Sequence, residues 1–170
     1  MNIIIPMAGS GKRFVSAGYK TPKPLIRVGG KRIVEYVCEM YDRENDKFVF
    51  VCNNRHLEDT DMESILKGMA NHTEIVAMPE HKLGPVYTIL GAEDFIADSE
   101  PLIVSYCDNP VTWRYDDFKQ FIEDNSVDGC IVSHTGFHPH TLSSTMFAYS
   151  KTDIRGRVEE IKEKACYTSN

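Results

Sequence analysis

The stretch from Gly9 to Arg13 combines two features that proteins use to bind a phosphate group. Gly9 and Gly11 have no Cβ atom, so the backbone of this turn can approach a ligand closely. Lys12 and Arg13 add positive charge, and the apolar run Ile3–Ile5 just before the turn has the character of a strand. Turns of this kind bind phosphate oxygens in several unrelated folds. The sequence therefore predicts a phosphate site here and leaves open which phosphate it binds.

Positive charge is concentrated at the start of the chain. The first 34 residues carry seven basic side chains and no acidic one, whereas the other 136 carry 12 basic and 25 acidic side chains. The seven are Lys12, Arg13, Lys20, Lys23, Arg27, Lys31 and Arg32. This distribution predicts a local positive field that attracts a polyanion the size of a nucleoside triphosphate. The alternative is a basic surface that contacts only solvent. The net charge of −6 argues against a nucleic-acid partner.

Two well-known phosphate loops do not fit the spacing. A Walker A loop requires Ser or Thr where this chain has Arg13, and glycine where it has Pro6. A dinucleotide-binding turn requires a third glycine where this chain has Phe14, and a carboxylate near Val28 and Gly29. A P-loop kinase or GTPase and a dehydrogenase are therefore disfavoured.

Five motifs instead resemble those of the sugar-phosphate nucleotidyltransferases. The motifs are MAGSGKRF (7–14), TPKPL (21–25), LGPVYTIL (83–90), CDNP (107–110) and RVEEIKEK (157–164). Within that family the chain is most similar to the capsular-polysaccharide branch, which includes cytidylyltransferases. The resemblance runs from Met1 to about Lys164. It implies a Mg²⁺-dependent enzyme that transfers a nucleoside monophosphate from a nucleoside triphosphate to a phosphorylated acceptor and releases pyrophosphate.

The resemblance also implies substrates for this reaction. CTP is the favoured nucleotide, and the acceptor is a sugar 1-phosphate or another phosphorylated metabolite such as a phospho-amino acid. The product would serve capsular or surface polysaccharide synthesis. An acceptor phosphate is already an anion near neutral pH, so the reaction needs no general base and depends on positioning and charge neutralisation. The alternative is a nucleotide-binding regulatory module without turnover.

The same resemblance assigns roles to residues of the turn and of TPKPL. Arg13 would bind the departing pyrophosphate and Lys23 the α-phosphate. The remaining nucleotide-binding residues would be Ala8, Gly9, Ser10, Gly11, Lys12 and Gly84. Arg13 suits a bidentate clamp on phosphate oxygens, whereas Lys23 acts as a mobile point charge.

Asp108 is the candidate metal ligand. It follows an apolar run at 101–107, where the carboxyl end of a strand in an open α/β sheet binds ligands. A carboxylate there can hold Mg²⁺ against phosphates. The alternative is a turn aspartate, which the following Asn109 and Pro110 favour. The resemblance to the family favours the metal-binding role of Asp108.

Acceptor contacts are predicted later in the chain and beside Asp108. The resemblance implies that Glu163 binds acceptor hydroxyls, that Lys164 binds its phosphate, and that Asn109 contributes. A charged edge strand or helix face is the alternative at 157–164. The segment HTGFHPH supplies His134, His138 and His140, which are read as a loop lining the acceptor pocket or a surface loop rather than a zinc site.

Strand and helix patterns alternate along the chain. Predicted strands are 2–6, 47–53, 73–79, 101–107, 128–134 and 145–150. Predicted helices are 32–44, 57–70, 85–97 and 114–125. This alternation predicts an α/β fold with a mostly parallel central sheet and helices on both faces, a three-layer Rossmann-like arrangement. Residues 1–170 are predicted to form one nucleotidyltransferase domain that lacks the C-terminal part of the full family domain.

Composition sets the remaining expectations. The hydrophobic share of 42% and charged share of 26% are those of a globular domain. No apolar run approaches the roughly 20 residues of a membrane span, so a membrane partner is not expected. Five scattered cysteines without a CxxC pair predict reduced thiols and a cytoplasmic location. A homodimer is left open.

Overall fold

The computed structural model describes residues 1–96, 99–136 and 147–167. The chain divides into two compact units, Met1–Phe121 and Ile122–Asn170, and each is treated by itself. The prediction of a single domain over residues 1–170 stays a prediction. In the described residues, no helix has both the length and the apolar character needed to cross a membrane.

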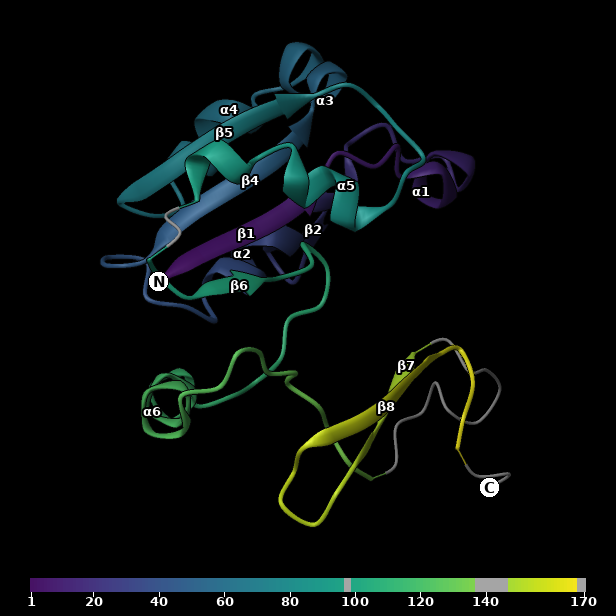
Figure 1. Cartoon of the computed structure of the whole chain (residues 1–170). Coiled ribbons are helices and arrows are strands. Elements are labelled where there is room, and N and C mark those ends of the chain that lie inside the picture. Colours follow the sequence, from purple (N-terminus) through teal and green to yellow (C-terminus); the bar gives the residue numbers. More distant parts are fainter. Residues whose placement is uncertain (97–98, 137–146, 168–170) are drawn as a thin grey trace. The chain divides into compact units, whose positions relative to one another are not determined.

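The first unit is built around a four-stranded parallel sheet (Figure 1). Its strands are β1 (Asn2–Met7), β4 (Lys47–Asn53), β5 (His72–Met78) and β6 (Leu102–Val104). The order is β5-β4-β1-β6, so the chain moves outward from β1 in one direction and then returns to its other side. The gap between the carboxyl ends of β1 and β6 is the topological switch point, where open α/β sheets bind ligands.

The two central strands are buried on both faces. Ile3, Ile4 and Ile5 of β1 are fully buried, as is the run from Phe48 to Cys52 of β4. Their alternating side chains enter two separate clusters, since successive residues of a strand face opposite sides. A continuous apolar run is typical of parallel strands covered on both faces.

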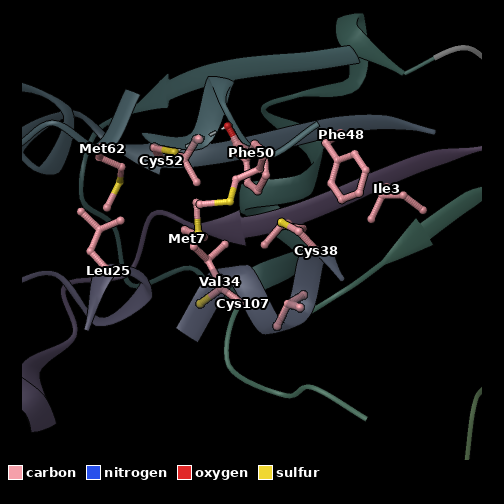
Figure 2. Packing of buried hydrophobic residues seen from close by; sticks show 14 of the residues in the cluster. Ile3, Met7, Leu25, Val34, Cys38, Phe48, Phe50, Cys52, Met62 and Cys107 are labelled. Atoms are coloured by element: carbon pink, nitrogen blue, oxygen red, sulfur yellow. Dashed lines mark hydrogen bonds between the residues drawn. The ribbon is translucent and has the colours of Figure 1, made fainter. Parts of the chain in front are cut away.

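Helices cover both faces. On one face, α2 (Ile33–Cys38) and α4 (Met62–Lys67) pack Val34 and Met62 against the cluster that contains Ile3 (Figure 2). On the other face, α5 (Pro85–Leu90) and the short 3-10 helix η2 (Glu93–Phe95) accompany Ala92, which packs with Ile4. The predicted fold class, a covered and mostly parallel α/β sheet, is confirmed.

Short elements connect these layers. They are α1 (Lys12–Ser16), η1 (Lys23–Leu25), β2 (Arg27–Val28), β3 (Lys31–Arg32) and α3 (Asn54–Asp59). The helix predicted at 57–70 is instead two helices, because the chain is extended at Thr60. The Thr60 hydroxyl donates to the His56 carbonyl (2.6 Å) and accepts from the Met62 N–H (3.2 Å). It therefore satisfies backbone groups at the end of α3 and the start of α4.

The second unit contains an antiparallel hairpin of β7 (Ala148–Thr152) and β8 (Val158–Glu163). α6 (Tyr115–Asn125) includes the boundary between the units. The pattern at 157–164, which allowed a helix or an edge strand, is therefore a strand. The strand predicted at 128–134 is wrong: within the described part of the chain the segment pairs with no strand, and Ile131 and Val132 are more than half exposed. An apolar run alone does not make a strand without a partner for its backbone.

Candidate functional site

A cavity of about 500 Å³ opens in the first unit beside the ends of β1 and β6. Its walls come from three parts of the sequence: the glycine turn and the segment after it, one face of α3, and the residues that follow β6. The residues with proposed or possible roles in it are Gly9, Ser10, Gly11, Lys12, Arg13, Lys23, His56, Asp59, Thr60 and Asp108. The cavity therefore lies at the switch point of the sheet.

The glycine turn has a conformation that needs glycine. Gly11, the residue before α1, has φ 60° and ψ 26°, the left-handed region that other residues rarely adopt. A Cβ atom built on Gly9 or Gly11 would meet no protein atom within 4 Å. Open space on this side of the turn is what close approach of a phosphate requires.

Lys23 and Asp108 meet in this cavity although 85 positions separate them in the sequence. The Lys23 ammonium donates a hydrogen bond to Oδ2 of Asp108, forming an ion pair. Lys23 begins η1 directly after Pro22, and its Nζ lies 5.6 Å from the centroid of the Phe14 ring. A cation this close to an aromatic face is attracted by it, so Phe14 helps to orient the lysine.

Basic residues outnumber acidic ones around the cavity. Lys12, Arg13, Lys20 and Lys23 line it, against the carboxylates of Asp59 and Asp108. A concave site with an excess of cations concentrates anionic ligands. Its geometry and charge therefore suit a ligand that carries several negative charges.

Cys107 follows β6 and lines this cavity, although its side chain is largely buried. Burial, with a smaller contribution from the Asp108 charge, raises the pKa of its thiol to about 11. The thiol is thus neutral at physiological pH, which makes it a core residue rather than a nucleophile.

Asn53 is a contributor that sequence reasoning missed. It is buried at the end of β4, and its amide donates to the Ala8 carbonyl (3.3 Å) while its oxygen caps α3 by accepting from the Arg55 N–H (3.0 Å). This one side chain links the start of the glycine turn to the start of α3. An asparagine at the end of a strand, just before a helix, is the signal that could have revealed it.

One face of α3 was also missed. His56 and Asp59 line the cavity three residues apart and share one face of α3, and Thr60, extended just after the helix, lines it as well. Burial lowers the pKa of His56, and its Nδ1 is buried without a hydrogen-bond partner. The signal was present in the sequence, since α3 starts at the carboxyl end of β4, the edge that binds ligands.

The other predicted nucleotide and acceptor residues lie outside this cavity lining. Ala8 is buried beneath the turn, and Gly84 precedes α5 with φ 88° and ψ 175°, a conformation suited to glycine. Asn109 is exposed in the turn after Asp108. In the second unit, Lys164 Nζ forms an ion pair with Glu163 Oε1 (3.1 Å). The roles predicted for these residues stay predictions.

The histidine segment is described only in part. The ring of His134 meets that of Phe147 edge-to-face, with centroids 6.1 Å apart. His138 and His140 lie outside the described residues. Among the residues that are described, no three or more histidine, cysteine or carboxylate side chains gather at one place where they could hold a metal.

A parallel sheet of this order, with a glycine turn after the first strand and a carboxylate after the fourth, defines an α/β protein with a cavity at its switch point whose basic lining suits an anionic ligand. More specifically, the chain belongs to the nucleotidyl transferase family, whose profile matches residues 2–165.

Comparison with individual proteins agrees with that family. The chain is 29% identical over 99 residues to the bifunctional protein GlmU of Methanococcus maripaludis strain C7. That match covers 58% of this chain but only 23% of the relative, so the chain matches about a quarter of the length of this curated protein.

Two solved structures show the same fold. The nucleoside-diphosphate-sugar pyrophosphorylase from Vibrio cholerae RC9 aligns with a TM-score of 0.63 at 17% identity, covering 98% of this chain and 68% of that one. UDP-glucose pyrophosphorylase complexed with UDP-glucose aligns with a TM-score of 0.64 at 18% identity, covering 96% and 69%. At these identities the likeness concerns the fold. The capsular-polysaccharide branch stays a prediction.

Proposed function

We propose that this chain carries the nucleotide site of a Mg²⁺-dependent nucleotidyltransferase. The enzyme would transfer a nucleoside monophosphate from a nucleoside triphosphate to a phosphorylated acceptor and release pyrophosphate. The observation that carries this proposal is the ion pair of Lys23 and Asp108 in a cavity shared with the glycine turn. Family membership supports the reaction class.

The residues of the cavity suit this chemistry. The acceptor phosphate attacks the α-phosphorus, and negative charge grows on the bridging and terminal oxygens as pyrophosphate leaves. The glycine turn would bind the triphosphate through its backbone, with Ser10 and Lys12 beside it. Arg13 would hold the departing pyrophosphate, and Lys23 would neutralise the α-phosphate as it becomes crowded.

Asp108 is suited to hold Mg²⁺. Its carboxylate is partly exposed in the cavity and is paired with the Lys23 ammonium, which stands where a metal cation would neutralise it. Magnesium accepts one or two carboxylates together with phosphate oxygens and water, so one aspartate is a sufficient protein contribution. The bound ion would supply charge neutralisation at the phosphates. Lys23 would then be free to turn from Asp108 toward the α-phosphate.

The substrates are the finer part of the proposal. The likeness to the capsular-polysaccharide branch favours CTP, and a sugar 1-phosphate or another phosphorylated metabolite, such as a phospho-amino acid, as the acceptor. Gly84 would lie against the nucleoside, and Asn109, Glu163 and Lys164 would contact the acceptor. A pathway to capsular or surface polysaccharide follows from the same likeness.

A substrate screen tests the proposal. Each of the four nucleoside triphosphates is combined with a panel of sugar 1-phosphates and other phosphorylated metabolites, and pyrophosphate release is measured with Mg²⁺ and with EDTA. We expect release with one pair, which EDTA abolishes. Nucleotide binding without release for any pair would favour the regulatory module, and no nucleotide binding at all would overturn both.

A further inference from the structure

The α3 wall of the cavity has no role in the proposed reaction so far. This wall consists of His56, Asp59 and Thr60, which line the cavity together with the glycine turn. The Thr60 hydroxyl is already engaged with backbone groups of its own segment. His56 is different, because its Nδ1 is buried and has no hydrogen-bond partner.

The two ring nitrogens of His56 are not equivalent. Nδ1 is buried and has no hydrogen-bond partner. A proton on Nδ1 would be a buried donor without an acceptor, at a cost of about 1–3 kcal/mol. Burial lowers the pKa of His56, which favours the neutral ring with a single proton. With that proton on Nε2, Nδ1 is an unpaired acceptor, and the N–H belongs to the ring nitrogen that is not among the buried atoms without a partner and can donate to a ligand or to solvent. The ring therefore offers one N–H donor, at Nε2.

The surroundings of His56 indicate which ligand group that donor would meet. Arg13, Lys12 and Lys20 line the same cavity, whereas Gly84, the residue expected near the nucleoside, does not. The cavity is therefore the phosphate end of the proposed site. Asp59 lies one helical turn from His56 and opposes an anion, but the four cations that line the cavity outnumber its two carboxylates, Asp59 and Asp108.

The position of His56 is fixed from two sides. Asn53 ties the start of α3 to the carbonyl of Ala8, at the beginning of the glycine turn. Thr60 closes the other end of α3 through the His56 carbonyl. The imidazole is thus carried by a short helix whose start is tied to the turn that would bind the triphosphate and whose last turn is closed by a local hydrogen bond. Such support is what a ligand-binding side chain requires.

We propose that His56 is a ligand-binding residue whose Nε2–H donates a hydrogen bond to an oxygen of the diphosphate group, both in the bound nucleoside triphosphate and in the released pyrophosphate. The identity of this ligand rests on the proposed function. A neutral donor contributes a directed contact where Arg13 and Lys23 contribute charge. Loss of this donor should weaken the binding of ligands that contain a diphosphate and leave the binding of the acceptor unchanged.

Titration calorimetry with inorganic pyrophosphate, at a fixed Mg²⁺ concentration, tests the contact. His56→Leu removes the donor, His56→Gln places an amide N–H near the position of Nε2, and His72→Leu is the matched control at the opposite end of the sheet. We expect about 10- to 100-fold weaker binding for His56→Leu, because hydrogen bonds to charged groups are the stronger ones. Glutamine should restore most of the affinity, and His72→Leu should bind as the unmodified chain does. Wild-type affinity in His56→Leu, or no rescue by glutamine, would overturn the proposal.

Nitrogen NMR of the unmodified protein gives an independent result that does not depend on how a variant folds. We expect the His56 ring to be the Nε2–H tautomer and its signals to shift when pyrophosphate is added. An Nδ1–H tautomer, or signals that pyrophosphate leaves in place, would overturn the contact. Failure of the two proposals can be told apart. Pyrophosphate binding that depends on His56, without turnover for any substrate pair, contradicts the proposed function alone.

Discussion

The parallel sheet of the first unit ends in two different ways. At its amino end, Asp46 is buried and accepts three hydrogen bonds, from the Met1 ammonium (3.0 Å), the Tyr115 hydroxyl (2.7 Å) and the Asp42 N–H (3.1 Å). The ring of Tyr115 packs edge-to-face on Tyr41, with centroids 5.4 Å apart. The amide of Asn2 is the exception at this end, since it is buried without a partner.

At the carboxyl end, the polar groups are arranged for something other than stability. Gly11 is in the left-handed region, Nδ1 of His56 lacks a partner, and Lys23 and Asp108 satisfy each other in an open cavity. Exposed ion pairs of this kind add little to stability, about 0–1 kcal/mol. The two ends of the sheet therefore differ in kind. Buried hydrogen bonds stabilise the amino end, whereas the carboxyl end keeps charged side chains that are accessible to a ligand.

The largest expected effect is at the carboxyl end. Lys23→Ala should lower kcat by about 10²–10³-fold while weakening nucleotide binding much less, because the ammonium matters most as charge develops at the α-phosphate. Turnover and nucleotide affinity are measured on the same preparation, with Lys31→Ala, a lysine outside the cavity lining, as the control. A change in kcat below about threefold would remove Lys23 from the reaction.

Asp108→Asn should change the Mg²⁺ concentration that the enzyme needs for activity. The substitution keeps the shape of the side chain and removes its charge, so half-maximal activity should require a much higher Mg²⁺ concentration. The melting temperature should change little, because only an exposed pair with Lys23 is lost. An unaltered magnesium titration would return Asp108 to the role of a turn residue.

Asp46→Asn tests the amino end. The amide cannot accept all the hydrogen bonds that the carboxylate accepts, so the free energy of unfolding should fall by about 1–3 kcal/mol, as seen by chemical denaturation. The kcat of the folded fraction should be unchanged. If Asp46→Asn lowered kcat as strongly as Lys23→Ala, the division between the two ends would be wrong.

The core between the two ends gives the smallest effect. Burial raises the pKa of the Cys38 thiol to about 12, from 9.0. A raised pKa stabilises the folded state fully below pH 9, and that stability is lost as pH rises from 9 toward 12, because the unfolded chain ionises first. Between pH 8 and pH 10 the unmodified chain should thus lose about 1 kcal/mol more stability than Cys38→Ala. If urea unfolding showed the same loss of stability for the unmodified chain and for Cys38→Ala, the raised pKa of Cys38 would be contradicted.

The apolar runs of the sequence determined the strands and thus the fold class. β4 was predicted at 47–53 and β1 to within one residue, because a continuous apolar run is typical of a parallel strand buried on both faces. β5, an edge strand with one buried residue, was predicted to within one residue at each end from its short β-branched run. The glycine turn was also recognisable from its residue types, whereas Lys23 and Asp108 were singled out by the family resemblance, and their roles stay predictions.

Tertiary structure alone decided which residues meet. Strand order, which brings Lys23 to Asp108 across 85 positions, follows from how the sheet is wound. The exposure of His56 to the cavity depends on the distant segments that line it together with α3, namely the glycine turn and the residues after β6. The apolar run at 128–134 has strand propensity yet forms no strand, because a strand exists only where another strand pairs with its backbone. Propensity is a property of the local sequence, whereas pairing, burial and the meeting of distant charges belong to the folded chain.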